Sequence, residues 1–227
     1  MSALLWLGAT VLAYLAALIF ARRVNAHPLA NPVLIASLLV IASMLATDTG
    51  IGPYMDGGQW LLFLLGPATV ALAVPLFRNW SGVRRAAGPL FLAISAGSLT
   101  AVATALATAW ALGAEIPTLL SLAPKSVTTP IAMGIAHSTG GLQSLAAAIV
   151  IVTGIIGAVI GPWLLNRLGI RDPQAQGVAL GTAAHGIGTA RAFQQSEESG
   201  TFSGVAMGVN GIATALVLPW LLIWLFG

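Results

Sequence analysis

The chain has 227 residues; 58% of them are apolar, and only nine are basic and six are acidic. A soluble domain carries about 25% charged residues, so this composition excludes a soluble globular protein, and its hydrophobicity excludes a disordered one. A polytopic membrane protein remains. At about 20 residues per spanning helix, a single membrane domain over residues 1–227 has room for roughly six to eight transmembrane helices.

Six apolar runs, each long enough for a helix, follow one another along the chain. They cover residues 3–20, 33–46, 59–77, 86–112, 142–165 and 202–226. The second run is expected to end in a loop from Thr47 to Gly58, because this stretch is rich in turn-forming residues. The runs are too long and too continuous for barrel strands, so we predict an all-α membrane protein.

Two further segments, 117–141 and 174–194, are mostly apolar but are interrupted by Gly, Pro, Ser and Thr. Irregular backbone at membrane depth is tolerated only inside protein or beside a water-filled cavity. Each segment is either a re-entrant hairpin or a full but discontinuous helix, and the charges do not exclude the second. Two oppositely directed hairpins would be typical of an inverted-repeat, transporter-like core.

The distribution of charge predicts the orientation. Loops after the first, third and fifth runs carry arginine, whereas those after the second and fourth carry only acidic residues. The positive-inside rule therefore places the N-terminus outside the cytoplasm, in a multi-pass protein of the plasma (inner) membrane. The net charge of +3 reflects this orientation, and no nucleic-acid partner is expected.

A faint internal similarity recurs at a spacing of 57 residues. Leu65 to Pro75 precedes the similar stretch Leu122 to Pro130 by that distance, and Gly97 and Gly154 have the same separation. Such matches arise easily by chance in a sequence rich in Ala, Leu and Gly. A structural repeat and a chance match both stay open.

The first motif that could carry chemistry is P-K-S-V-T-T-P, from Pro124 to Pro130. Its prolines remove backbone donors and stop a helix. Lys125 would cost at least about 2.5–3.5 kcal/mol at membrane depth, so it should face a cavity or a partner and could attract an anion. The hydroxyl groups that could bind the same ligand are those of Ser126, Thr128 and Thr129. Alternatively, Lys125 snorkels to the interface and the hydroxyls bond to their own helix.

The second motif is G-T-A-A-H-G-I-G-T-A-R, from Gly181 to Arg191. Its glycines allow a turn or a close approach to a ligand, and His185 can donate, accept or titrate. Arg191 could hold a carboxylate with two parallel hydrogen bonds. Further candidates for substrate binding in this motif are Thr182, Gly186, Gly188 and Thr189. The alternative is helix packing through small residues, with His185 on a carbonyl and Arg191 snorkelling.

Asn210 is a weaker candidate for substrate binding. It lies in an apolar run beside Gly204 and Gly208, which form a face of small residues, so helix packing is the preferred interpretation. An intramembrane enzyme with Ser126 as nucleophile and His185 as base is a third possibility. No carboxylate in a predicted span could orient His185, so we expect no enzymatic activity, and no metal or cofactor.

At these motifs the sequence resembles the LrgB (CidB/LrgB, antiholin-like) membrane protein family. The matching stretches are Phe63 to Phe77, Pro124 to Met133, Thr153 to Pro162, Ala179 to Ala192 and Gly204 to Gly211, so the resemblance spans nearly the whole chain. It places both central motifs at the substrate site. Many relatives carry Glu where this sequence has Gly134, which puts a coupling role for an acid there in doubt.

The resemblance implies two different functions. Some relatives look like carriers of small 2-oxo and 2-hydroxy monocarboxylates such as pyruvate, glycolate and glycerate. Family members were also named as modulators of murein hydrolase export and autolysis, paired with a small holin-like partner of the LrgA or CidA type. The leading hypothesis is a carboxylate carrier that works by alternating access, in the lipid bilayer and as a homodimer. The alternative is an antiholin-like regulator without transport of its own.

Overall fold

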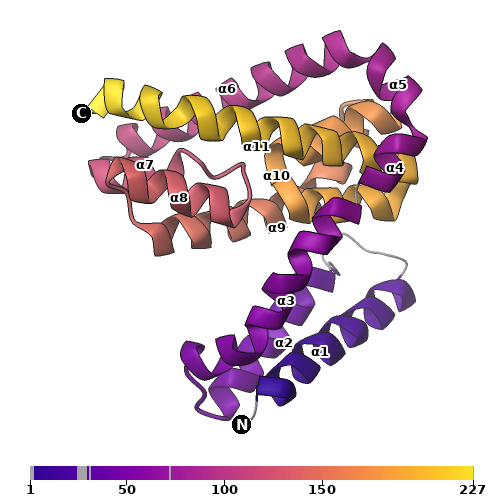
Figure 1. Cartoon of the computed structure of the whole chain (residues 1–227), viewed down its shortest axis with the longest axis vertical. Coiled ribbons are helices and arrows are strands. Elements are labelled where there is room, and N and C mark those ends of the chain that lie inside the picture. Colours follow the sequence, from indigo (N-terminus) through magenta and orange to yellow (C-terminus); the bar gives the residue numbers. More distant parts are fainter. Residues whose placement is uncertain (1–2, 25–29, 31, 72, 227) are drawn as a thin grey trace. The chain divides into compact units, whose positions relative to one another are not determined.

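The computed structural model describes residues 3–24, 30, 32–71 and 73–226 (Figure 1). Within these ranges every regular element is a helix, which confirms an all-α polytopic protein. The described helices long and apolar enough to cross a membrane are α1 (Ala3–Arg23), α6 (Ala87–Ala111), α9 (Gln143–Arg167) and α11 (Glu197–Phe226). The helix α2 (Pro32–Ala46) is apolar but shorter. A total of six to eight crossings stays a prediction.

The chain divides into two compact units, and the first ends at Val74. It contains α1, α2 and α3 (Ile51–Ala71), and α1 packs on both of the others. The expected loop up to Gly58 was wrong beyond residue 50, because α3 already begins at Ile51. A Cβ atom at Gly57 would overlap the carbonyl oxygen of Ala3, so this glycine serves close packing of two helices rather than a turn.

The second unit begins at Pro75 and holds both central motifs. The helix α4 (Ala73–Arg78) crosses the boundary between the units, and the remaining helices of the second unit are α5 (Trp80–Arg85), α7 (Ile116–Leu122), α8 (Thr129–Thr139) and α10 (Pro173–Gln195). Ile94 and Ala206 share one apolar cluster, and Leu106 and Leu218 share another. The first halves of α6 and α11 therefore pack together, as do their second halves, so these two long helices run parallel.

The segment 117–141 forms a helical hairpin. It consists of α7 and α8, separated by a non-helical break over residues 123–128. The backbone N–H of Leu142 donates to Oγ of Ser121 at 2.7 Å, and Gly141 packs against the backbone of Ser121. After α8 the chain has therefore returned to the level of the last turn of α7. This contact decides in favour of a re-entrant hairpin and against a discontinuous full crossing.

The segment 174–194 reverses direction in the same way. Inside α10 the backbone leaves the helical conformation at Ala184 (φ −127°, ψ 16°) and His185 (φ 41°, ψ −132°). Gly188 packs directly against the carbonyl of Leu180, eight residues earlier. In a straight helix those residues would be separated by about 12 Å along the axis. We call the two halves the outgoing limb (173–183) and the returning limb (186–195).

The two hairpins enter from opposite ends of α9. The base of the first bonds to Leu142, immediately before α9 begins. At the base of the second, Gln176 Nε2 donates to Oδ1 of Asn166 at 2.9 Å and to the carbonyl of Ile170 at 2.7 Å, where α9 ends. A 25-residue helix rises about 37 Å, enough to cross the hydrocarbon core. The predicted opposite directions of the two segments are confirmed.

The order of elements repeats at the spacing seen in the sequence. A shift of 57 residues places α6 on residues 144–168, almost the bounds of α9, and places α8 on 186–196, the returning limb of α10. Gly97, Gly154 and Gly211 continue this spacing. Each faces a hairpin: their Cβ positions meet Thr182, His185 and Ile131, respectively. The arrangement favours a structural repeat over a chance match.

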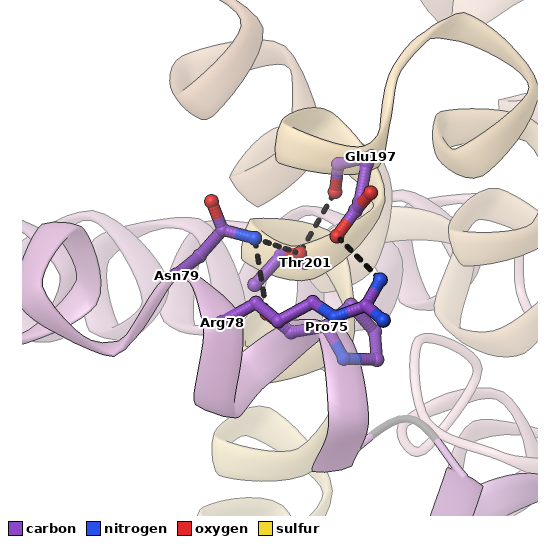
Figure 2. A network of polar contacts seen from close by, with 5 residues as sticks. All are labelled: Pro75, Arg78, Asn79, Glu197 and Thr201. Atoms are coloured by element: carbon purple, nitrogen blue, oxygen red, sulfur yellow. Dashed lines mark hydrogen bonds and ion pairs between the residues drawn. The ribbon is translucent and has the colours of Figure 1, made fainter.

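A polar network joins α4 and Asn79, the N-cap residue of α5, to the start of α11, as Figure 2 shows. Asn79 Nδ2 donates to the carbonyl of Pro75 at 3.0 Å and to Oγ1 of Thr201 at 3.3 Å. Arg78 lies 3.9 Å from the Glu197 carboxylate. Both partners are exposed, so the ion pair itself adds little stability. The network places the arginine-rich loop at the same end of this unit as the base of the second hairpin. The positive-inside rule predicts this arrangement, because it puts both on the same side of the membrane.

Candidate functional site

The breaks of the two hairpins meet at Asn210, in the middle of α11. Its Nδ2 donates to the backbone carbonyl of Ser126 at 3.3 Å and to that of Thr182 at 3.2 Å. Ser126 lies in the break of the first hairpin, and Thr182 lies two residues before the non-helical Ala184. Asn210 is only 1% exposed. One buried carboxamide therefore links both broken segments, and the interpretation of Asn210 as a packing residue was incomplete.

The local sequence explains why these two carbonyls need a partner. In a helix the carbonyl of Ser126 would accept from the N–H of residue 130, but Pro130 has no N–H. The carbonyl of Thr182 lies in the last turn of the outgoing limb, where helix ends leave carbonyls unpaired. Buried carbonyls almost always find a donor. The two N–H groups of Asn210 satisfy both.

Helix packing through Gly204 and Gly208 of α11 stays a prediction. A Cβ atom at Gly204 or Gly208 would meet nothing within 4 Å among the described residues. Within the part of the chain that the structure describes, the two glycines therefore make no close helix contact. The close approach occurs instead on the α10 side, where Gly177 packs on the carbonyl of Ser199 and Gly181 packs on that of Ser203.

A second meeting point of the hairpins is Val150, in α9. Its side chain packs in one cluster with Val127 and Ala132 of the first hairpin. Its carbonyl oxygen lies 3.0 Å from Nε2 of His185, at the kink of the second. His185 is 5% exposed, so its ring is held inside the protein. Sequence reasoning missed Val150, because an apolar residue inside an apolar run carries no signal of such a role.

The break in the first motif carries a positive electrostatic potential. Lys125 is half-buried, and its Nζ donates to Oγ of Ser126 at 3.3 Å. Thr128 is the N-cap residue of α8, Thr129 begins that helix, and Pro130 occupies its first turn. The N-terminus of a helix carries free N–H groups and a partial positive charge, both of which favour an anion. The ammonium group and this helix terminus therefore lie within the same short stretch of chain.

The second motif is only partly at the junction. Thr189 Oγ1 donates to the carbonyl of His185 at 2.9 Å and lies 3.0 Å from Oγ of Ser203. Gly186 and Gly188 lie just beyond the kink, on the returning limb. Arg191 Nη1 donates to Oε1 of Gln194 on the same limb, at 3.1 Å. The structure therefore gives Arg191 a contact on its own helix, and its grip on a substrate stays a prediction.

A groove of about 550 Å³ leads along the outgoing limb to the break. It lies between α6 and α10 and is lined from Asp172 and Gln174, at the base of the hairpin, to Gly97 and Thr182. Most of its other lining residues are apolar. The hydroxyl of Thr182 is buried and has no hydrogen-bond partner among the described residues. The groove therefore passes Thr182, whose carbonyl accepts from Asn210 at the junction of the hairpins.

Comparisons with known proteins place the chain among relatives of nearly the same length. A Bacillus subtilis protein named YxaC is 36% identical over 96% of this chain and 94% of its own, and YwbG of the same organism is 38% identical over 94% of each. "Holin-like protein CidB" of Staphylococcus aureus (strain N315) is 30% identical over 97% of this chain and 96% of its own. No solved structure matches.

The family comparison covers the whole hairpin region. Its match extends over residues 10–224 and thus includes both broken segments and all of the helices that surround them. Together with the relatives of 30% identity and more, this coverage leaves no large part of the chain unaccounted for. The chain belongs to the LrgB-like family of integral membrane proteins.

Proposed function

We propose that this protein is a carrier for small monocarboxylates of the pyruvate, glycolate or glycerate type, which works by alternating access. The observation that carries the proposal is the meeting of two oppositely entering hairpins at the buried Asn210. Transporters with inverted repeats place their substrate where broken helices meet near the membrane midplane. Relative movement of the bundles around such a junction would expose it to one side of the membrane at a time.

The charges at the junction favour an anion over a cation as the transported substrate. Lys125 lies at the first break, and no acidic residue occurs in either motif. A carboxylate would bind the ammonium group of Lys125 and the N–H groups at the start of α8, while its oxo or hydroxyl group would bind the hydroxyls of Ser126 and Thr182. Arg191 would attract the substrate toward the returning limb.

Lys125 is expected to determine affinity for the substrate. Lys125→Ala should raise the concentration needed for half-maximal uptake about tenfold, since a charged hydrogen bond contributes about 1.5–3 kcal/mol. Lys125→Arg keeps the positive charge and is the matched control, which should retain most of the affinity. The measurement is uptake of labelled pyruvate and glycolate into proteoliposomes that contain the purified protein.

Arg191→Ala provides an internal comparison in the same assay. We expect a smaller loss than for Lys125→Ala, because the Arg191 guanidinium bonds to Gln194 on its own helix. Parent-like uptake by both variants would contradict the assignment of the site. Absence of uptake by the parent protein, in vesicles where the protein is folded, would contradict the carrier function itself.

A second function is favoured by the relatives, since several are named "Holin-like protein CidB". On this alternative the chain is an antiholin-like regulator that binds a small holin-like membrane protein and controls murein hydrolase export and autolysis. It predicts a stable complex with that partner and no solute flux through this chain alone. Purification of a flux-competent homodimer without the partner would count against it.

A further inference from the structure

We propose that the junction of the two hairpins also contains a site for a monovalent cation, Na⁺, formed by Asn210, Thr182 and the carbonyl oxygen of Ser126. As a coupling ion, this cation rests on the proposed carrier function, but its binding can be measured without transport. The proposal begins from two backbone carbonyls, from separate breaks of the chain, that converge on one side chain. Unwound carbonyls and the ends of half-helices are the groups that coordinate Na⁺ in broken-helix transporters.

The Asn210 carboxamide can serve either of two states of this junction. With Nδ2 toward the carbonyls of Ser126 and Thr182, it satisfies them as a donor at 3.3 and 3.2 Å. A half-turn of the amide would instead present Oδ1 to the same carbonyls. Three oxygens facing one another repel unless a cation lies between them. The same residues therefore close the junction without a cation and can coordinate one when it binds.

Thr182 and the next turn of α11 carry further neutral oxygens. The Thr182 hydroxyl is buried and unpartnered among the described residues, and Thr214 Oγ1 lies 3.4 Å from Oδ1 of Asn210. The carbonyl of Thr182 also lies near the C-terminal end of the outgoing limb, the negative end of a helix dipole. The groove beside α6 runs from the hairpin base past Thr182.

The chemistry of these ligands selects a monovalent ion. Divalent cations such as Ca²⁺ and Mg²⁺ are usually held by one or more carboxylates. The sequence has no acidic residue between Glu115 and Asp172, and none in the second motif. Carbonyl, hydroxyl and amide oxygens without a carboxylate carry too little negative charge for a divalent ion. They suit a single positive charge, and only a weakly bound one, because the Lys125 ammonium group bonds to Ser126 at the same break.

The test is thermal unfolding of the purified, detergent-solubilised protein in NaCl, KCl or choline chloride at equal ionic strength. The parent should show a saturable rise of the unfolding midpoint with Na⁺ that KCl and choline chloride do not produce. Thr182→Val removes one ligand and should weaken the apparent affinity for Na⁺ about tenfold. Asn210→Asp replaces the N–H donor by a carboxylate, so it should be less stable in choline and bind Na⁺ about tenfold more tightly.

The matched control is Asn79→Asp, which makes the same chemical change at the edge of the protein. Its response to Na⁺ should equal that of the parent. The proposal is overturned if the parent shows no Na⁺-specific shift, or if Asn210→Asp and Thr182→Val leave the response unchanged. A Na⁺-specific shift in a parent protein that shows no uptake would contradict the carrier function and support the cation site. Uptake by the parent without any Na⁺-specific shift would contradict the cation site and support the carrier function.

Discussion

Replacing Asn210 with leucine is expected to abolish uptake and to lower the free energy of unfolding by about 2–6 kcal/mol. Leucine is similar in size but has no N–H, so the buried carbonyls of Ser126 and Thr182 lose their donor. Each buried acceptor left without a partner costs about 1–3 kcal/mol. Because folded proteins are stable by only about 5–15 kcal/mol, this loss would approach the whole margin. Chemical unfolding and proteoliposome uptake measure the two effects.

Asn79→Leu is the control for this substitution. Asn79 also donates to a backbone carbonyl and a hydroxyl, but it is only partly buried at the end of the bundle. Water can replace its bonds, so we expect a loss below about 1.5 kcal/mol and near-normal uptake. If Asn210→Leu folds and transports like Asn79→Leu, the carboxamide does not hold the two breaks together, and the junction is not the centre of the site.

The broken segments could be predicted because their causes are local. Pro124 and Pro130 stop a helix wherever they stand, and the glycines of the second motif loosen the chain around His185. The alternation of basic and acidic loops along the chain also predicted that the two segments enter the membrane from opposite sides. Only the choice between a hairpin and a full crossing required the structure, since it depends on contacts such as that between Gly141 and Ser121.

The junction itself could not be predicted, because its contacts join distant parts of the chain. Asn210 lies 84 residues from Ser126 and 28 from Thr182. Nothing in the sequence around an asparagine says which carbonyls it will meet after folding. Packing was therefore the natural interpretation, and the neighbouring Gly204 and Gly208 reinforced it. For Arg191 the structure adds a hydrogen bond to Gln194 on the same limb, which its sequence neighbourhood did not predict, and its role toward a substrate stays a prediction.

Substitution of Gly154 by alanine should damage the contact between α9 and the kink of the second hairpin. A Cβ atom there would lie 2.7 Å from Cε1 and 2.8 Å from Nε2 of His185, and 2.9 Å from Cδ1 of Ile187. The imidazole cannot easily move away, because its Nε2 bonds to the Val150 carbonyl. Gly154→Ala should therefore cost about 1–3 kcal/mol from overpacking and should remove most of the uptake. Gly208→Ala, with no atom within 4 Å, is the control and should fold and transport normally.

A double-mutant cycle with His185→Gly tests whether a clash with the His185 ring causes the damage in Gly154→Ala. His185→Gly removes the ring and suits the positive φ of 41° at this position, although it gives up the bond to Val150. If the clash with the ring is the source of the damage, Gly154→Ala should cost much less in the His185→Gly background. The coupling energy should then fall within about 0.5–3 kcal/mol, the range for residues in contact. Additive losses in the two backgrounds would mean that Gly154 does not hold His185 in place. The contact of α9 with the second break would then have to rest on Gly157, whose Cβ position meets Ala184.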